Sequence, residues 1–135
     1  MNLKFKVNKP ISNVITYLTD INKFVTVHPV ITKLESKGDD NYLVYETLKM
    51  GFIPFSFTYP VVIKSDTQNA VVTYSAIVKK MVQIEMHFQL STSGNQTIIE
   101  ETTTFKSFLP VKFIMGKIFK KQHSLLFKNI EKMSD

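Results

Sequence analysis

The stretch LPVKFIMGKIFKKQHSLLFKNIEKM, residues 109–133, has the longest helical pattern in the chain. Placed at about 100° per residue, its large apolar side chains form one stripe, and Lys117, Lys121, Lys128 and Lys132 gather on the opposite side. Such a helix can lie on an anionic membrane surface, or it can cover an apolar face inside the protein. It would extend roughly 35 Å. The stripe consists of Val111, Met115, Ile118, Phe119, Leu125, Leu126, Ile130 and Met133.

The segment before it, residues 31–108, has a period of two, which predicts strands. The clearest alternation is MVQIEMHFQL, residues 81–90, whose apolar residues point inward while Gln83, Glu85, His87 and Gln89 point outward. Short turns join consecutive strands, so we expect an antiparallel sheet with one packed face. Only residues 109–133 are long enough to cover that face, which favours the covering role. Strands are predicted over 2–8, 31–38, 41–50, 55–65, 70–80, 81–90 and 96–108.

Two short elements are expected between the first and second strands. One helix enters through Pro10 and carries apolar residues at helical spacing from Ile11 to Leu18. Residues 20–29 form a second short helix or an irregular turn that ends at Pro29. Farther along, Pro60 indicates a bulge or an exposed edge within its strand. The predicted fold class is α+β, with six to seven antiparallel strands packed on a long C-terminal helix.

Composition narrows the classes of function. A chain of 135 residues suits a single domain, residues 1–135. The formal charge is +6 and all 17 basic residues are lysine, so specific nucleic-acid recognition, which relies on arginine, is not expected. Cysteine is absent, which removes disulfides and thiol nucleophiles. No apolar run reaches about 18 residues, and the first residues lack the apolar core of a signal peptide, so a cytoplasmic location is expected.

The stretch PISNVITYLTDINKFVTVHPVI, residues 10–31, resembles the opening of the START-like (SRPBCC) helix-grip superfamily. That superfamily includes polyketide cyclase-like and lipid-transport proteins, and the resemblance implies a cavity between a curved sheet and the C-terminal helix. The order of elements agrees with it over the whole chain. Members often carry tryptophan in this region and this chain has none, which leaves the subfamily open. The matching positions are Val14, Tyr17, Leu18, Asp20, His28 and Pro29.

Polar residues on apolar faces mark the candidate cavity wall, because a plain core would leave them unsatisfied. If GFIP, residues 51–54, is a hairpin turn that pairs Met50 with Phe55, then Glu46 lies opposite Tyr59 on the inner face. A register slip of one residue would put Glu46 in solvent instead.

The last hairpin and the C-terminal helix add four more polar candidates. A two-residue turn at 94–95 pairs Phe88 with Glu101 and points Thr103 inward as well, although a bulge would reverse these faces. Gln122 and Asn129 lie in the apolar stripe of the helix, where they line the cavity or lie at a sheet edge or dimer seam. The predicted ligand-binding residues, in a sizeable apolar cavity, are Glu46, Phe57, Tyr59, Met86, Phe88, Glu101, Thr103, Phe105, Gln122 and Asn129.

The three histidines are scattered. His28 is expected at a helix end, either as a structural residue or at the border of the cavity entrance. His87 points outward, and His123 flanks the helix stripe. This spacing does not fit a metal site, and no metal or cofactor is predicted.

These features favour binding of a hydrophobic or amphipathic small molecule, either a lipid or a polyketide-like compound. One alternative is a cyclase or hydratase that uses an inward Glu46 or Glu101 as general base, with Tyr59 as donor to an enolate. Another is a lipid-exchange protein that docks its lysines transiently on an anionic membrane. No catalytic residue is assigned, and the oligomeric state is left open.

Overall fold

A computed structural model describes residues 1–50, 52–108, 110 and 112–134. Over these residues the chain forms a seven-stranded antiparallel sheet with the strand order β1-β7-β6-β5-β4-β3-β2, together with three helices. The predicted order of one strand, two short helices, six strands and a long helix is confirmed, and so is the α+β class. The elements are β1 (Asn2–Val7), α1 (Ile11–Thr19), α2 (Ile21–Val27), β2 (Ile31–Gly38), β3 (Asn41–Met50), β4 (Ile53–Asp66), β5 (Val71–Val78), β6 (Val82–Ser93), β7 (Gln96–Lys106) and α3 (Lys112–Lys132).

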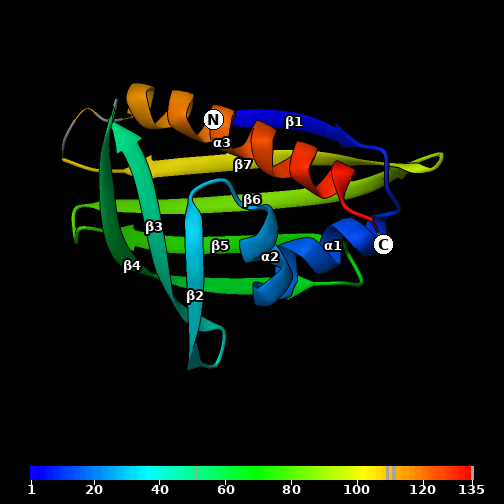
Figure 1. Cartoon of the computed structure of the whole chain (residues 1–135). Helices are drawn as coiled ribbons and strands as arrows, with labels where there is room; N and C mark the ends of the chain where they lie inside the picture. The colour runs from blue at the N-terminus through cyan, green and yellow to red at the C-terminus, as the bar shows by residue number, and fades with distance from the viewer. Residues whose placement is uncertain (51, 109, 111, 135) are drawn as a thin grey trace.

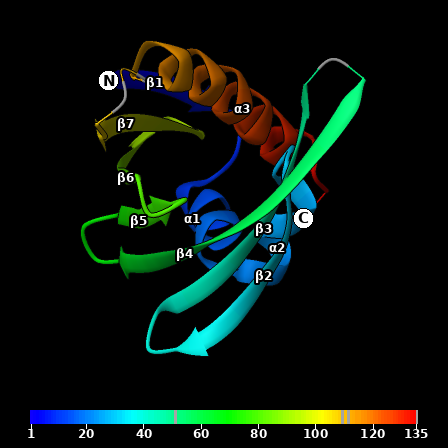
Figure 2. The same cartoon turned by 90° about the vertical axis from the view of Figure 1, so that its left-hand side faces the viewer.

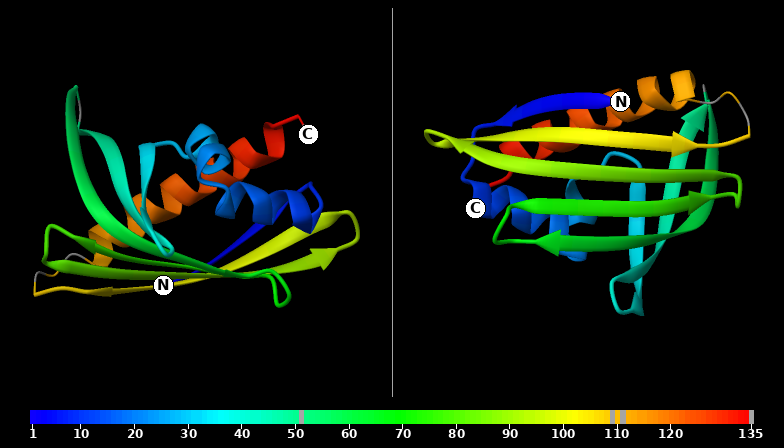
Figure 3. Two further views of the ribbon diagram at one scale, coloured as in Figure 1. Left: turned by 90° about the horizontal axis from the view of Figure 1, so that it is seen from below. Right: turned by 180° about the vertical axis from the view of Figure 1, so that it is seen from behind.

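The sheet curves around the helices (Figure 1; Figure 3). Strands β1, β7, β6 and β5 form its flatter part, while β4, β3 and β2 turn up beside α3. Helix α3 runs along the concave face, and α1 and α2 fill the end of that face near the C-terminus. The core therefore lies between the sheet and the three helices.

The two short helices follow from local sequence. Pro10 precedes the first residue of α1, and its ring presets the backbone without needing an N–H donor. Residues 20–29, for which the pattern allows a helix or a turn, contain the helix α2. The side chain of Asp20 caps it by accepting hydrogen bonds from the backbone N–H groups of Asn22 and Lys23, at 3.0 and 3.3 Å.

Pro60 lies where β4 separates from β5. The β4–β5 pairing runs from Val61, opposite Ala76, to Asp66, and it does not include Pro60, which has no N–H to donate. On its other side Pro60 pairs in regular register with Leu43 of β3, so no bulge forms there. The part of β4 before Pro60 is consequently held by β3 alone, and this hairpin leaves the main sheet (Figure 2).

The predicted apolar stripe of α3 is partly wrong. Leu126 and Ile130 are buried as expected, but Leu125, Ile118 and Met133 are exposed, and Val111 lies outside the described residues. The stripe rests on apolar residue types alone, whereas two polar side chains also face the sheet and rotate the buried face. The fully buried positions of the helix are Gln122, His123, Leu126, Phe127 and Ile130.

No helix in the described part of the chain is long and apolar enough to cross a membrane.

Two adjacent leucines test this rotation of α3. Leu126→Ala should lower the free energy of unfolding by about 2–5 kcal/mol, because the side chain is 1% exposed and its removal leaves a cavity. Leu125→Ala makes the same chemical change in the same helix at a side chain that is 41% exposed, and should cost less than about 1 kcal/mol. Urea denaturation of both variants measures the difference; equal losses would contradict the observed rotation.

Candidate functional site

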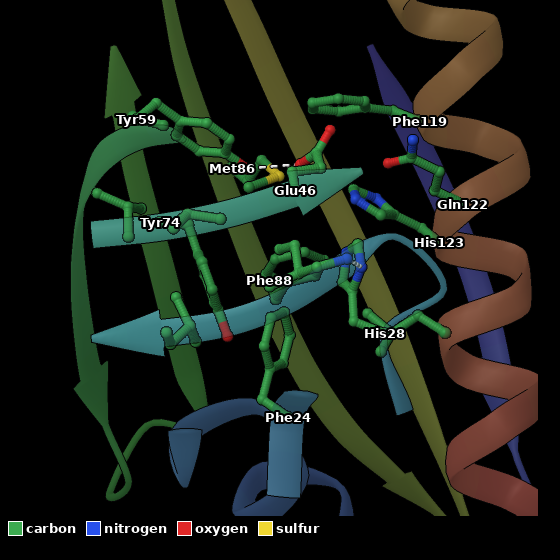
Figure 4. Close-up of a pocket in the computed structure, with 16 residues that line it drawn as sticks. Phe24, His28, Glu46, Tyr59, Tyr74, Met86, Phe88, Phe119, Gln122 and His123 are labelled. Carbon is green, nitrogen blue, oxygen red and sulfur yellow. Dashed lines mark hydrogen bonds between the residues drawn. The ribbon is translucent and has the colours of Figure 1, made fainter. Parts of the chain in front are cut away.

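A small cavity lies between the sheet and α3 (Figure 4). It has about 40 Å³ of room for the centres of water molecules, which is space for roughly three waters. Its wall is mostly apolar, with polar side chains concentrated toward α3. The lining residues are Phe24, His28, Ile31, Leu34, Val44, Glu46, Tyr59, Val61, Tyr74, Ala76, Met86, Phe88, Phe119, Gln122, His123 and Leu126.

A second space of about 80 Å³ adjoins the first, between the first half of α3 and the hairpin of β3 and β4. Four side chains line both spaces and so form the partition between them: Glu46, Tyr59, Phe119 and Gln122. The expectation of one sizeable cavity is therefore wrong for this conformation. Side chains divide the available space into an inner and an outer cavity.

Glu46 and Tyr59 form a hydrogen bond at this partition. The Tyr59 hydroxyl donates to Glu46 Oε1 at 2.8 Å. Burial raises the pKa of Glu46, while the hydrogen bond from Tyr59 acts in the opposite direction, and burial also raises the pKa of Tyr59 well above its ordinary value. The Tyr59 proton is thus engaged by Glu46.

The register at this hairpin differs from the expected one. Glu46 pairs with Phe57, and Tyr59 pairs with Val44, so the strands are offset by two residues from the predicted pairing of Glu46 with Tyr59. Because side chains alternate with a period of two, an offset of two keeps each of them on the predicted face. Residue 51 of the predicted turn lies outside the described residues.

The carboxylate of Glu101 joins the sheet to α3. Glu101 pairs with Phe88, as expected from a two-residue turn, and it is 1% exposed. His123 Nδ1 donates to Glu101 Oε1 at 2.6 Å, and the Thr103 hydroxyl donates to Oε2 at 2.5 Å. Both carboxylate oxygens are therefore engaged, and Glu101 and Thr103 reach the cavity only through His123.

His123 is a site residue that the sequence pattern, which places it beside the helix stripe, does not identify. Its burial could have been inferred from its spacing, since it lies four residues before Phe127 and seven before Ile130. The ring contacts Phe88 and Phe119, with centroid distances of 5.9 and 5.1 Å. The hydrogen bond at Nδ1 leaves Nε2 as the nitrogen available to a ligand.

His28 lies next to His123 in the cavity wall (Figure 4). Its Nδ1 accepts hydrogen bonds from the backbone N–H groups of Val30 and Ile31, at 3.2 and 3.1 Å. An accepting Nδ1 places the proton of the neutral ring on Nε2. Burial, followed by repulsion from His123, lowers the pKa of His28 from 6.5 to about 3. His28 is thus both a structural residue at a helix end and a neutral donor in the cavity.

The structure brings five of the ten predicted ligand-binding residues to the inner cavity: Glu46, Tyr59, Met86, Phe88 and Gln122.

The other five predicted residues lie elsewhere, and Glu101 and Thr103 are described above. Phe57 lines the outer cavity. Phe105 packs edge-to-face on Phe119 at a centroid distance of 5.3 Å. Asn129 donates a hydrogen bond to the Val27 carbonyl at 2.8 Å, which ties α3 to the end of α2. Placing these residues on the cavity wall was therefore wrong, since pattern alone does not show which polar group finds a protein partner.

Within the described residues, no three His, Asp or Glu side chains lie close enough together to hold a metal ion. His87 is exposed on the outer face, where its ring lies 3.5 Å from the Thr73 hydroxyl.

Known proteins with similar sequences or structures place the fold. A model of the CoxG family, whose description names it as a component of carbon monoxide dehydrogenase, matches residues 4–103, while no curated protein sequence matches the chain. A START superfamily protein from Mycobacterium smegmatis superposes with a TM-score of 0.81 at 11% identity, covering 99% of this chain and 98% of that one.

Two solved enzymes have the same fold. Norcoclaurine synthase from Thalictrum flavum has a TM-score of 0.71 at 16% identity, with 98% of this chain and 83% of that one covered. The Zhui aromatase/cyclase from a Streptomyces species has a TM-score of 0.67 at 11% identity, with 97% and 90% covered. The START-like resemblance and the helix-grip fold are confirmed.

The buried neutral state of His28 predicts an acid-sensitive fold. Its pKa is depressed in the folded state, so unfolding takes up a proton, and stability falls as pH drops below 6.5 toward about 3. The slope from this group reaches about 1.4 kcal/mol per pH unit. His28→Asn retains a side-chain acceptor for the backbone N–H groups without the titration, and should flatten the decline between pH 6.5 and about 5, above the usual carboxylate range. Stability measured by denaturation across this range tests the prediction.

The matched control is His87→Asn on the exposed outer face, which should keep the wild-type slope. A His28→Asn protein with an unchanged slope would show that His28 is not held neutral by burial.

Proposed function

The chain belongs to the CoxG family, and we propose that it binds one hydrophobic or amphipathic small molecule between the sheet and α3. The observation that carries the proposal is the cavity itself: an apolar wall interrupted by a few buried polar groups, which is the usual construction of a small-molecule site.

The polar groups suggest how a ligand is oriented. His28 offers an N–H donor at Nε2, His123 offers its own Nε2, and Gln122 contributes an amide in the same region. The opposite wall is formed by Val61, Ala76 and other apolar side chains of the sheet. We therefore propose a ligand with an apolar body against the sheet and a hydrogen-bonding group toward α3, as in a lipid or a polyketide-like compound.

Binding requires the two cavities to merge. Pockets for drug-sized ligands measure about 300–1,000 Å³, whereas the inner cavity has room for only a few waters. Phe119 is the largest apolar side chain in the partition, and it lies in the less buried half of α3, where Phe113 and Ile114 are exposed. Movement of this half of the helix breaks fewer core contacts than movement of the half that contains Leu126. We propose that the ligand enters past Phe119.

An acid–base enzyme is the second candidate, favoured by the raised pKa of the Glu46 carboxyl in an apolar wall. Norcoclaurine synthase and an aromatase/cyclase use the same fold for chemistry. Glu46 would be the base, because Glu101 is occupied by His123 and Thr103. A β-polyketone probe should then cyclise faster with the protein than without it, and Glu46→Gln should abolish the difference. No acceleration by the wild-type protein would eliminate this candidate.

A cytoplasmic location and the absence of a nucleic-acid partner stay predictions.

Two substitutions should change ligand binding in opposite directions. Phe119→Ala removes the partition and should increase uptake of an environment-sensitive apolar dye severalfold. Ala76→Leu fills the inner cavity and should reduce uptake by at least tenfold, because Ala76 is 4% exposed and lines the wall. Fluorescence titration gives the affinities, and native mass spectrometry of the purified protein tests for a co-purifying hydrophobic molecule.

The control is Ile77→Leu, one residue from Ala76 on the outer face of β5, which should bind dye like the wild type. Thermal melts establish that each variant is folded. Equal dye binding by folded Ala76→Leu and wild type would place the dye outside the cavity and contradict the proposal.

A further inference from the structure

Large apolar side chains are exposed at one end of the molecule. Phe52 and Phe108 are 102% and 99% exposed, Ile53 and Phe113 are each 72% exposed, and Ile114 is 60% exposed. They belong to the β3–β4 hairpin, the segment after β7 and the start of α3. These segments lie together at the left of Figure 1, the end that faces the viewer in Figure 2. Exposed apolar groups of this size, gathered on one surface, commonly mark an interaction site.

The same end is strongly basic. We define the apolar end by residues 49–55, 79–81 and 106–118, which contain six lysines and no aspartate or glutamate. Lysine ammonium groups lie over aromatic rings of this surface: Lys79 is 5.4 Å from the centre of Phe55, and Lys117 is 4.4 Å from the centre of Phe113. The six are Lys49, Lys79, Lys80, Lys106, Lys112 and Lys117, all exposed.

The apolar end also surrounds the outer cavity. Leu48 and Phe57 of the hairpin and Met115 and Ile118 of α3 line that cavity, directly behind the exposed residues of the same two elements. A partner at the apolar end would therefore cover the opening of the outer cavity.

We propose that the apolar end docks on an anionic lipid bilayer, with Phe52, Phe108 and Phe113 inserted among the acyl chains and the lysines against the headgroups. Inserted apolar groups ringed by lysine are the two features that bind a protein to an anionic membrane surface. A bilayer is fluid, so it can accept aromatic residues that project from separate segments, whereas a rigid protein partner needs a surface of matching shape.

A second copy of the chain fits this surface less well. A symmetric dimer through the apolar end would place six lysines against six lysines, with no acidic group in the same segments to compensate them. The back of α3 is a poorer membrane surface, since around Lys121, Lys128 and Lys132 the exposed large apolar residues are only Leu125 and Met133, and neither is aromatic.

Vesicle co-sedimentation tests the docking. The full chain should bind phosphatidylcholine vesicles that contain phosphatidylglycerol much more tightly than vesicles of phosphatidylcholine alone, and added salt should weaken the binding. A triple change of Phe52, Phe108 and Phe113 to Ser should reduce binding at least tenfold. These side chains contribute little to the core, and melting temperatures verify that the variant folds.

Two charge variants provide a matched comparison. Changing Lys49, Lys79 and Lys112 to Glu should weaken binding by about a hundredfold, since each lysine near an anionic surface contributes roughly a factor of five.

Reversing Lys121, Lys128 and Lys132 to Glu gives the same net charge on the back of α3, and should leave at least a tenth of the wild-type affinity. Equal losses in the two variants would mean that only net charge matters and would overturn the proposal. So would failure of the wild type to bind anionic vesicles.

Sedimentation velocity separates the remaining occupant. A wild-type dimer that the three Phe→Ser changes convert to a monomer would assign the apolar end to a second copy and overturn membrane docking. The docking does not depend on a ligand in the cavity, so Ala76→Leu should bind vesicles like the wild type. Loss of dye binding and loss of vesicle binding thus report on different proposals.

Discussion

The buried carboxylate of Glu101 is the constraint on which the arrangement of α3 depends. A carboxylate that is removed from water without partners costs several kcal/mol, so its position requires donors on both oxygens. Thr103 supplies one from the same strand, and His123 supplies the other from the helix. Because His123 must face β7, the helix can adopt only one rotation, in which Gln122 and Leu126 face the cavity and Leu125 faces outward.

This rotation also determines the chemistry of the cavity wall. The imidazole of His123 has one nitrogen held by Glu101 and presents the other beside His28, whose own Nδ1 is held by two backbone N–H groups. Two rings fixed in this way need little reorganisation when a polar group arrives, since their orientations are already set by the fold. The apolar part of the wall has no such restriction, and there Phe119 can be displaced without leaving a polar group unpaired.

Much of the fold followed from sequence because strand parity is robust. The face of Glu46 was predicted correctly even though its register was offset by two residues, since an even offset preserves the face. The rotation of α3 was partly wrong because the sequence pattern treats histidine and glutamine as outward-facing. The size of the cavity could not be predicted, because it depends on which rotamers fill the space between helix and sheet. Asn129 and Thr103 show the same limit: their residue types suggested a ligand, and the fold gives them protein partners.

The separation of β4 from β5 at Pro60 divides the sheet into two mechanical parts. Beyond Pro60 the β3–β4 hairpin is paired only with itself and β2, so its length can change without altering the register of β5, β6 and β7. Adding or deleting residues in matched pairs at its tip would keep every side chain on its present face. The family could thus vary the reach of the hairpin over the opening, and with it the range of ligand lengths admitted, while Glu101 and the helix core stay unchanged. Evolution of specificity in this fold needs only a hairpin of adjustable length.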